Sequence, residues 1–314
     1  MTSRTSSASA LLLLGMTLLG ACGGGDTGPK MAPLSVHLTD APFPVSEVQS
    51  ADLYVVRIDA KLAESSESEA AAGVTGDETN RNPERGWVTV ARPERRIDLL
   101  ALRGGSTTNL GQSTIPTGRY RGFRLILDTD RSSITLKDGT VLDGNRTPGI
   151  KWPSAGRTGI KVMLAQPIDL VENGTAMVID FDLAQSFVLR GSTITELGLN
   201  FKPVLRATAR DITGSVSGSV HAATETGPIV PGSMVEVLRA GTTLDDTVSA
   251  NIVTTTTADA QGAFTAAFLL PASYTLRVTA PANQAVSYAP ALVPTVTVVE
   301  GVSAPVTVVV LPNR

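Results

Sequence analysis

The sequence predicts an all-β chain that folds as two tandem β-sandwich domains behind an N-terminal leader. Short segments of alternating apolar and polar residues recur from residue 34 onward, and this alternation is the period of half-buried strands. Glycine, proline, asparagine and aspartate separate these segments at short intervals, as turns do in sandwiches. The only cysteine is Cys22, so no disulfide can form within the chain and an apolar core must supply the stability.

Residues 1–21 have the composition of a signal peptide. Arg4 supplies a positive charge, and the apolar run over residues 8–20 is too short to span a bilayer but long enough for a signal sequence. The run ends in the four residues Leu19, Gly20, Ala21 and Cys22. These four resemble the lipobox of bacterial lipoproteins, in which a signal peptidase cuts before the cysteine and the cysteine sulfur receives a diacylglycerol. The alternative is an ordinary secretory signal with an incidental cysteine.

Lipidation at Cys22 would attach the chain to a membrane, which is therefore an expected partner. Each buried methylene contributes about 0.8 kcal/mol, so two or more acyl chains, such as palmitate, anchor a protein stably. Gly23 rather than aspartate follows the cysteine. In lipoproteins of this kind that implies transfer to the outer membrane, on either its periplasmic or its outer face. Residues 22–33 contain many glycines and two prolines and are expected to form a flexible tether.

The first domain is predicted over residues 34–211. In its second strand the alternation changes parity after Val55, which indicates a β-bulge. Residues 63–85 are too polar for a core and are expected to form a mobile loop of unassigned role. Residues 97–102 predict a helical turn that the Gly104–Gly105 pair stops. The strands are expected at residues 34–38, 53–62, 87–90, 118–127, 134–136, 141–142, 161–164, 176–181 and 199–209.

Several short motifs of the first domain follow one another in a characteristic order. They are Leu38-Thr39-Asp40-Ala41-Pro42, Trp87-Val88-Thr89-Val90, residues 97–103, Leu110-Gly111 and residues 115–120. In this order they resemble the bacterial domain of unknown function numbered 4382, and the resemblance covers about half of the chain. It implies a β-sandwich-like module of exported lipoproteins with no established activity. The segment 63–85 is less regular than the family pattern.

The second domain is predicted over residues 212–314. Its strands are expected at residues 212–220, 234–238, 253–256, 264–268, 274–278, 293–299 and 306–311, and seven strands at this spacing favour a β-sandwich. Segments 259–264 and 272–276 resemble the carboxypeptidase regulatory-like and Cna-B-type modules. The resemblance implies a non-catalytic spacer with Tyr274 buried and its hydroxyl bonded to the backbone. The lysine–asparagine cross-link of some Cna-B modules cannot form, because residues 213–314 contain no lysine.

The composition excludes several classes of function. The net charge is −3 and no cluster of lysine and arginine occurs, so nucleic acid is not expected as a partner. The chain has no glycine-rich phosphate loop, and no cofactor is expected. His37 and His221 fall in different predicted domains, so no metal centre is expected either. An irregular calcium site stays open on four residues whose simpler role is turn formation, Asp128, Asp138, Asp143 and Asn145.

Four side chains stand out as candidates for a site. Asp40 lies in the best-matched motif and is expected to cap the turn before Pro42, with a ligand-binding carboxylate as the alternative. Trp152 lies between turn residues, where its ring either plugs the end of the sandwich or contacts a sugar. Asp180 and Asp182 leave the same face of one strand, which we expect to be solvated.

We therefore expect a lipid-anchored envelope protein with a non-catalytic binding, adhesion or structural-presentation role. Its ligand would be a glycan or another envelope protein, contacted by loops of the first domain, with the second domain as spacer. The alternatives are a carbohydrate-binding module or a carboxylate-dependent hydrolase of polysaccharide. The hydrolase would need Asp180, Asp182 or Asp143 gathered in a concave pocket beside Trp152.

Overall fold

The computed structural model describes residues 30–41, 47–63, 86–153, 158–282 and 284–313. These residues form the all-β fold that the sequence predicts, with strands in five sheets and helical turns of three or four residues. The predicted signal peptide, the lipidation motif and nearly all of segment 63–85 lie outside the described residues.

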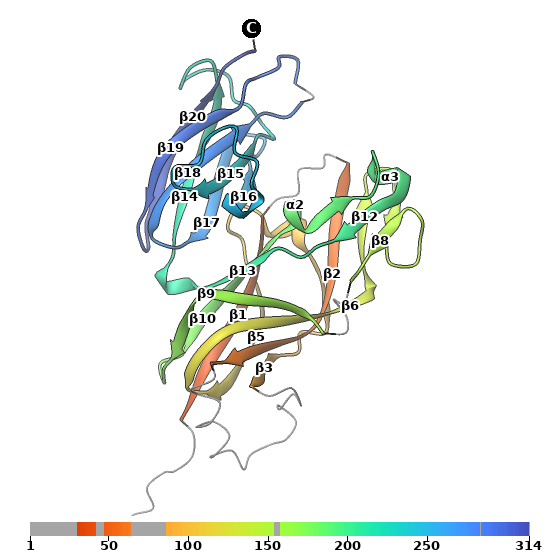
Figure 1. The fold of residues 1–314 in the computed structure, drawn as a ribbon, viewed down its shortest axis with the longest axis vertical. Helices are drawn as coiled ribbons and strands as arrows, with labels where there is room; N and C mark the ends of the chain where they lie inside the picture. Colours follow the sequence, from red (N-terminus) through yellow and green to blue (C-terminus); the bar gives the residue numbers. More distant parts are fainter. Residues whose placement is uncertain (1–29, 42–46, 64–85, 154–157, 283, 314) are drawn as a thin grey trace, which may run out of the picture.

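The first β-module, residues 31–209, is built on two facing sheets (Figure 1). One sheet has the strand order β13-β10-β1-β5. In it β1 (Met31–Ala41) runs parallel to β10 (Thr175–Asp182) and antiparallel to β5 (Thr108–Pro116), and β13 (Leu205–Ala209) lies antiparallel to β10. The strand β1 begins three residues earlier than the strand predicted from the sequence, inside the predicted tether.

The other sheet is centred on two long antiparallel strands, β2 (Val48–Leu62) and β6 (Gly118–Leu136). A register shift between Val55 and Arg57 confirms the bulge predicted there. The marginal strands of this sheet are β3 (Trp87–Ala91), β4 (Arg95–Asp98), β7 (Val141–Leu142) and β9 (Ile160–Leu170). Strand β3 lies beside β5 and β9 beside β13, so the edges of the two sheets meet on both sides of the module. This closure shields strand edges that would otherwise pair with other chains.

Short elements complete the first β-module. The predicted helical turn is present as η2 (Leu99–Leu102), and the Asp98 carboxylate caps it by accepting the Leu100 N–H at 3.1 Å. Two helical turns and a small sheet follow along the chain: α2 (Leu183–Ser186), α3 (Ile194–Leu197), β8 (Gly149–Lys151), β11 (Phe187–Leu189) and β12 (Gly198–Phe201).

The second β-module, residues 214–310, is a sandwich of two sheets with strand orders β17-β14-β20 and β16-β15-β18-β19. Its seven strands lie within a few residues of the predicted ones. They are β14 (Gly214–Ala222), β15 (Met234–Arg239), β16 (Ile252–Thr257), β17 (Ala263–Leu269), β18 (Ala272–Thr279), β19 (Ala291–Val298) and β20 (Ser303–Val310). The Tyr274 ring is buried and its hydroxyl donates to the Leu270 carbonyl at 2.7 Å, which confirms its predicted role.

Each β-module has its own hydrophobic core. Buried apolar side chains between Ala32 and Ala209 form one cluster, and those between Val216 and Val310 form another. In β1 the alternation works as the sequence predicts: Leu34, Val36 and Leu38 are buried. The turn η3 (Arg210–Ile212) joins the modules directly, and η4 (Ser249–Asn251) leads into β16.

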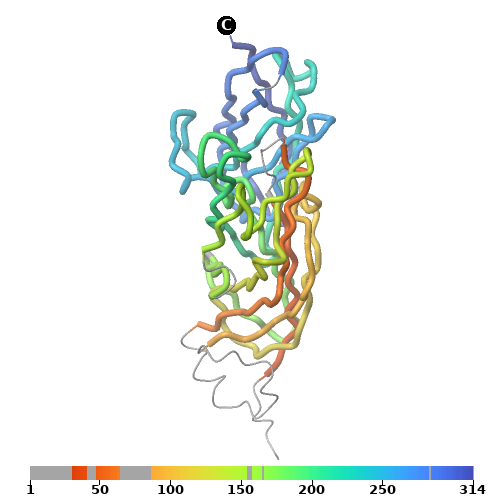
Figure 2. Tube along the Cα trace, turned by 90° about the vertical axis from the view of Figure 1, so that its right-hand side faces the viewer, coloured from red at the N-terminus to blue at the C-terminus, as the bar shows by residue number. Residues whose placement is uncertain are grey.

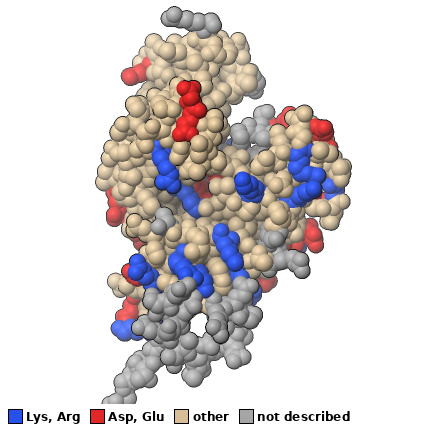
Figure 3. Space-filling model, viewed as in Figure 1, with Lys and Arg blue, Asp and Glu red and all other residues tan. Residues whose placement is uncertain are grey.

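The described chain is elongated along one axis. Strand β1 starts at one end of the molecule and the C-terminus lies at the opposite end (Figures 1 and 2). On the face in Figure 3, lysine and arginine side chains lie mainly over the first β-module, since residues 214–313 contain only Arg239 and Arg277. No helix among the described residues has the length and apolar character needed to cross a membrane.

Candidate functional site at the junction of the two modules

The strongest concentration of buried polar side chains lies where the two β-modules meet. Asp40 lies near the end of β1, Asp180 and Asp182 lie at the end of β10, and each of these residues is 5 % exposed. Our prediction that Asp180 and Asp182 lie on a solvated face is wrong. Strand β16 of the second module covers that face, since Thr254 and Thr255 donate to these two carboxylates.

Asp180 is the anchor of a bond network that crosses the junction. Its Oδ2 atom accepts from Arg206 Nε at 2.6 Å and from Thr254 Oγ1 at 3.1 Å. The two remaining nitrogens of Arg206 donate to the carbonyl oxygens of Ala267 at 2.9 Å and Phe268 at 3.0 Å. A guanidinium presents its donors in a fixed fork, so one arginine holds a carboxylate of its own module and two carbonyls of the other.

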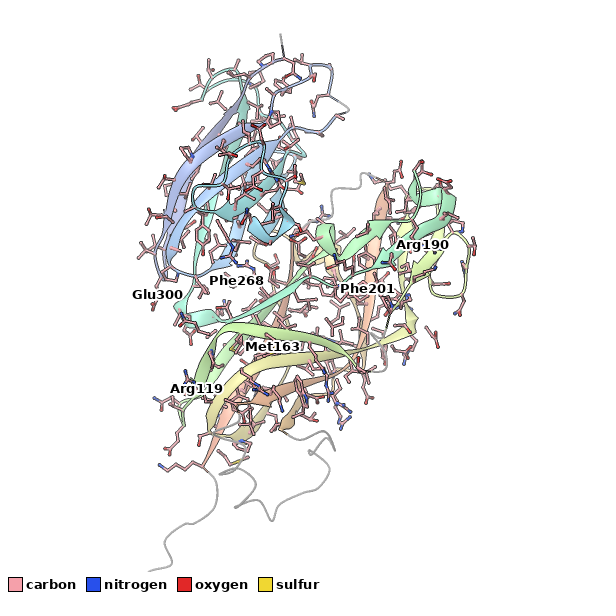
Figure 4. The ribbon with its side chains drawn as sticks, viewed as in Figure 1. Arg119, Met163, Arg190, Phe201, Phe268 and Glu300 are labelled. Atoms are coloured by element: carbon pink, nitrogen blue, oxygen red, sulfur yellow. The ribbon has the colours of Figure 1, made fainter. Side chains whose placement is uncertain are left out.

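A bulge in β17 places those two carbonyls. Gly214 pairs with Leu269 and Val216 with Ala266, so β17 has one residue more than its partner between these pairs. The extra residue lies at Ala267–Phe268, and Phe268 has the left-handed φ of +57°. A bulge of this kind re-aims the backbone, and here two successive carbonyls reach Arg206. Figure 4 shows Phe268 at the end of the second module that faces β13.

Asp182 has a second role as the cap of α2. Its carboxylate accepts from the Gln185 backbone N–H at 3.0 Å and from Gln185 Nε2 at 2.8 Å, while Thr255 Oγ1 lies 3.5 Å away. Burial raises the pKa of Asp182 to about 6, although the bonds from Gln185 act in the opposite direction. Part of the Asp182 population therefore carries a proton under mildly acidic conditions.

Asp40 is the exception in this network, because neither of its carboxyl oxygens has a hydrogen-bond partner in the described structure. The turn cap predicted for Asp40 is thus not formed. Burial raises the pKa of Asp40 well above its ordinary value, and the charges of Asp180 and Asp182 add to the rise. The nearby Leu183 amide and the Arg103 guanidinium act in the opposite direction. The environment favours the neutral, protonated form of Asp40.

A small cavity lies within the junction. Its volume is about 10 Å³, which is the space of a single water molecule. We call it the junction pocket, and it is lined by Thr39, Asp40, Gly105, Asp180, Arg206, Thr254, Thr255, Thr256, Thr265, Ala266, Ala267 and Phe268. Within the part of the chain that the structure describes, no three His, Cys, Asp or Glu side chains are arranged to hold a metal ion.

The packing around the junction pocket leaves its walls little freedom. Thr39 Oγ1 donates to the carbonyl oxygens of Leu102 and Ser106, which ties β1 to the chain after η2. Gly105 has a φ of +83°, and a Cβ added there would lie 3.0 Å from the Ala267 Cβ. The glycine pair predicted to stop the helical turn therefore also permits a close approach of the second module.

Trp152 and Asp143 do not join this site. The Trp152 ring packs against Phe187 and Phe201, with centroids 5.9 Å and 4.8 Å away, and its buried Nε1 atom has no partner in the described structure. Figure 4 shows Phe201 in the lobe formed by β12. Asp143 accepts the Asn145 N–H at 2.9 Å, which is the turn-forming role expected for it.

The other loop carboxylates also make turns. Asp128 accepts the N–H groups of Asp130 and Arg131, and Asp138 accepts that of Thr140 at 2.8 Å. The carboxylates of Asp128, Asp138 and Asp143 are thus bonded to local backbone N–H groups. Cys22 and the preceding Leu19, Gly20 and Ala21 lie outside the described residues, so lipidation stays a prediction.

Sequence reasoning missed a buried ion pair inside the first module. Arg124 is 2 % exposed and its Nη2 lies 2.8 Å from Oδ2 of the fully buried Asp59. Thr89 Oγ1 donates to Asp59 at 3.0 Å, and the Arg124 guanidinium lies 4.5 Å from the centre of the Trp87 ring. The sequence contains no clear signal for it, because β2 and β6 each contain several charged residues and the pattern does not single out this pair.

Comparisons with known proteins give a family but no function. A family model described as a domain of unknown function (DUF4382) matches residues 31–203. No curated protein matches the chain significantly.

Among solved structures, the shaft pilin SpaA of Lactobacillus rhamnosus GG is 10% identical, with a TM-score of 0.23 over 91% of this chain and 98% of that one. The minor pilin GBS52 of Streptococcus agalactiae is 13% identical, with a TM-score of 0.23 over 90% and 97%. The Bacillus anthracis TIE protein is 9% identical, with a TM-score of 0.24. The match covers 90% of this chain but only 35% of that protein, so this chain spans about a third of its length. Scores this low carry no argument about fold or function.

Proposed function

The chain belongs to the family of the domain of unknown function DUF4382, and we propose that it serves as a lipid-anchored, non-catalytic presentation protein of the cell envelope. In this role the first β-module stands next to the membrane and holds the second β-module away from it. The observation that carries the proposal is the bonded junction between the modules, centred on Arg206.

The direction of the chain supports this role. The described chain starts at one end of the long axis and the C-terminus lies at the other (Figure 2). An anchor at Cys22, eight residues before Lys30, would leave the second β-module farther from the lipid than the first. Stable anchoring would need two or more acyl chains.

The junction supports a stiff rather than a loose connection. The Arg206 guanidinium donates three hydrogen bonds and Thr254 donates one, and three of these four bonds cross between the modules. A hydrogen bond with a charged partner contributes about 1.5–3 kcal/mol. The link itself is only the single turn η3. Two domains joined in this way keep their relative orientation, as a presentation role requires.

The alternatives have less support. A carbohydrate platform at Trp152 would need an exposed ring face, but this ring packs against Phe187 and Phe201. A hydrolase at the buried aspartates would need a cleft that admits a sugar, and binding clefts measure about 300–1,000 Å³. The junction pocket, at about 10 Å³, is far smaller.

Metabolic labelling tests the anchor. Cells fed labelled palmitate should incorporate it into the wild-type chain and not into Cys22→Ser, and only the wild type should enter the detergent phase on phase separation. An unlabelled, water-soluble wild type would contradict the anchor. Protease shaving of intact cells would then tell whether the second β-module is displayed outside the cell or within the periplasm.

A further inference from the structure

We propose that the junction is a proton-binding site centred on Asp40, and that its occupancy controls how tightly the two β-modules are held together. The ligand is a proton on Asp40. The contact of β16 and β17 with the ends of β1 and β10 is the part that would be closed or open. The inference rests on the proposed presentation role, because it makes the stiffness of the junction depend on pH.

The buried state of Asp40 is the first argument. Asp40 is 5 % exposed as a residue, both of its carboxyl oxygens are buried at the junction pocket, and neither oxygen accepts a hydrogen bond in the described structure. An ionised carboxylate without partners in such a place is very costly, whereas a protonated carboxyl is neutral and supplies an O–H donor. A proton on Asp40 therefore removes a buried charge that has no hydrogen-bond partner in the described structure.

The charges around Asp40 are the second argument. Asp180 and Asp182 face it from β10, Arg206 lies on β13, and Arg103 follows η2. From β16 and β17 the described groups at the pocket are threonine hydroxyls and backbone carbonyls, which carry no charge. Arg206 is already bound by Asp180 and two carbonyls. Loss of the Asp40 proton would therefore add a third negative charge beside Asp180 and Asp182 in a buried place.

The direction of the response follows from linkage. The closed junction raises the pKa of Asp40 well above the value it has when exposed, so the closed form binds the proton more tightly than an open form. Low pH then favours the closed junction, and rising pH favours its opening. Asp182, whose pKa is about 6 in the closed form, acts in the same direction. Opening would release the bonds of Arg206 to β17 and of Thr254 to Asp180.

Amide hydrogen exchange of the full chain in detergent micelles tests the inference. The exchange is measured by mass spectrometry at pH 5 and pH 8 and corrected for the intrinsic exchange rates at each pH. The amides of β16 and β17 should lose at least tenfold protection at pH 8 in the wild type, since tenfold corresponds to one pKa unit. In Asp40→Asn, which copies the shape of the neutral carboxyl, the loss should be clearly smaller than in the wild type, because only Asp182 then responds to pH. Asp211→Asn, an exposed neighbour of the junction, should behave as the wild type does.

A second variant keeps the test decisive if Asp40→Asn does not fold. In Asp182→Asn a negative charge beside Asp40 is removed, so the closed junction tolerates an ionised Asp40 better and the loss of protection at pH 8 should be smaller than in the wild type. An unchanged loss in Asp182→Asn, a wild type without pH dependence, or an unaltered response in Asp40→Asn would each overturn the inference. Restoration of protection at pH 8 by added Ca²⁺ would also overturn it, because the ligand would then be a metal ion. Palmitate labelling is independent of the junction, so these failures leave the proposed anchor untouched.

Discussion

The guanidinium of Arg206 donates a hydrogen bond to the carbonyl oxygen of Phe268 at 3.0 Å, and this bond joins the two separate cores of the chain. The carbonyl is accessible to Arg206 because Phe268 lies in a bulge with a left-handed backbone. A non-glycine residue in that conformation costs of order 1 kcal/mol. The bond to a charged donor offsets that cost, so the strained strand and the arginine form one unit.

The first prediction concerns Arg206 itself. Replacing it with alanine leaves Asp180 without its ion pair and the Ala267 and Phe268 carbonyls without donors. We expect a loss of about 2–4 kcal/mol in the free energy of unfolding, measured by urea denaturation. The matched control is Arg146→Ala, because Arg146 forms an exposed pair with Asp143 that is worth about 0–1 kcal/mol. Equal losses in both variants would contradict the role assigned to Arg206.

The repeating features of the fold could be predicted from the sequence, because they depend on local pattern. The seven strands of the second module follow from period-two alternation and from turns such as Gln261-Gly262. Tyr274 and the bulge after Val55 were also predicted. Strand β5 was not, because its segment Thr108–Pro116 has buried apolar side chains only at Leu110 and Ile115.

The junction could not be predicted, because its pattern is not local. Asp180 and Asp182 alternate with apolar residues, which is the pattern of a strand with one solvent-exposed face. Their cover comes from Thr254 and Thr255, more than 70 residues later. Threonine is common on both exposed and buried strands, so the threonine run of β16 does not reveal that it faces carboxylates. Only the tertiary structure brings these groups together.

The second prediction concerns two tyrosine hydroxyls that hold the chain in the same way. Tyr120 donates to the Pro116 carbonyl and Tyr274 to the Leu270 carbonyl, each at 2.7 Å and across four residues. Phenylalanine at either position removes the donor and keeps the ring. We expect each change to lower the free energy of unfolding by about 1–2 kcal/mol, because a buried carbonyl loses its partner. Tyr288→Phe serves as the control in thermal unfolding and should change the stability by less than either.

The third prediction concerns the buried pair of Asp59 and Arg124. Arg124→Met takes the buried cation from the fully buried Asp59 carboxylate and leaves its partners Arg57 and Thr89 in place, and we expect a loss of about 2–4 kcal/mol. The double variant Asp59→Leu with Arg124→Met should be more stable than Arg124→Met alone, because no charge then remains in the core. A double-mutant cycle by chemical denaturation measures this coupling. Additive losses would show that the two side chains act independently.

The fourth prediction is a maximum of stability at acidic pH. It follows because the pKa of Asp59 is lowered in the folded chain, whereas the pKa values of Asp40 and Asp182 are raised. Burial tends to raise the pKa of Asp59, but hydrogen bonds from Arg124, Arg57 and Thr89 outweigh burial and the net pKa is lowered. The stabilisation by Asp59 is therefore present above its ordinary pKa of 3.8 and is lost as pH falls through the lowered value.

Asp40 and Asp182 respond in the opposite sense. Their pKa values are raised in the folded chain, so their stabilisation is complete below pH 3.8 and is lost as pH rises, for Asp182 through about 6. A rise from 3.8 to about 6 corresponds to about 3 kcal/mol. Together these groups place the maximum near pH 4. Urea denaturation between pH 3 and pH 8 measures it, and the decline above pH 4 should become shallow in the double variant Asp40→Asn with Asp182→Asn. A wild type whose stability stays level or increases from pH 4 to pH 8 would show that the buried carboxyls do not hold protons in the folded chain.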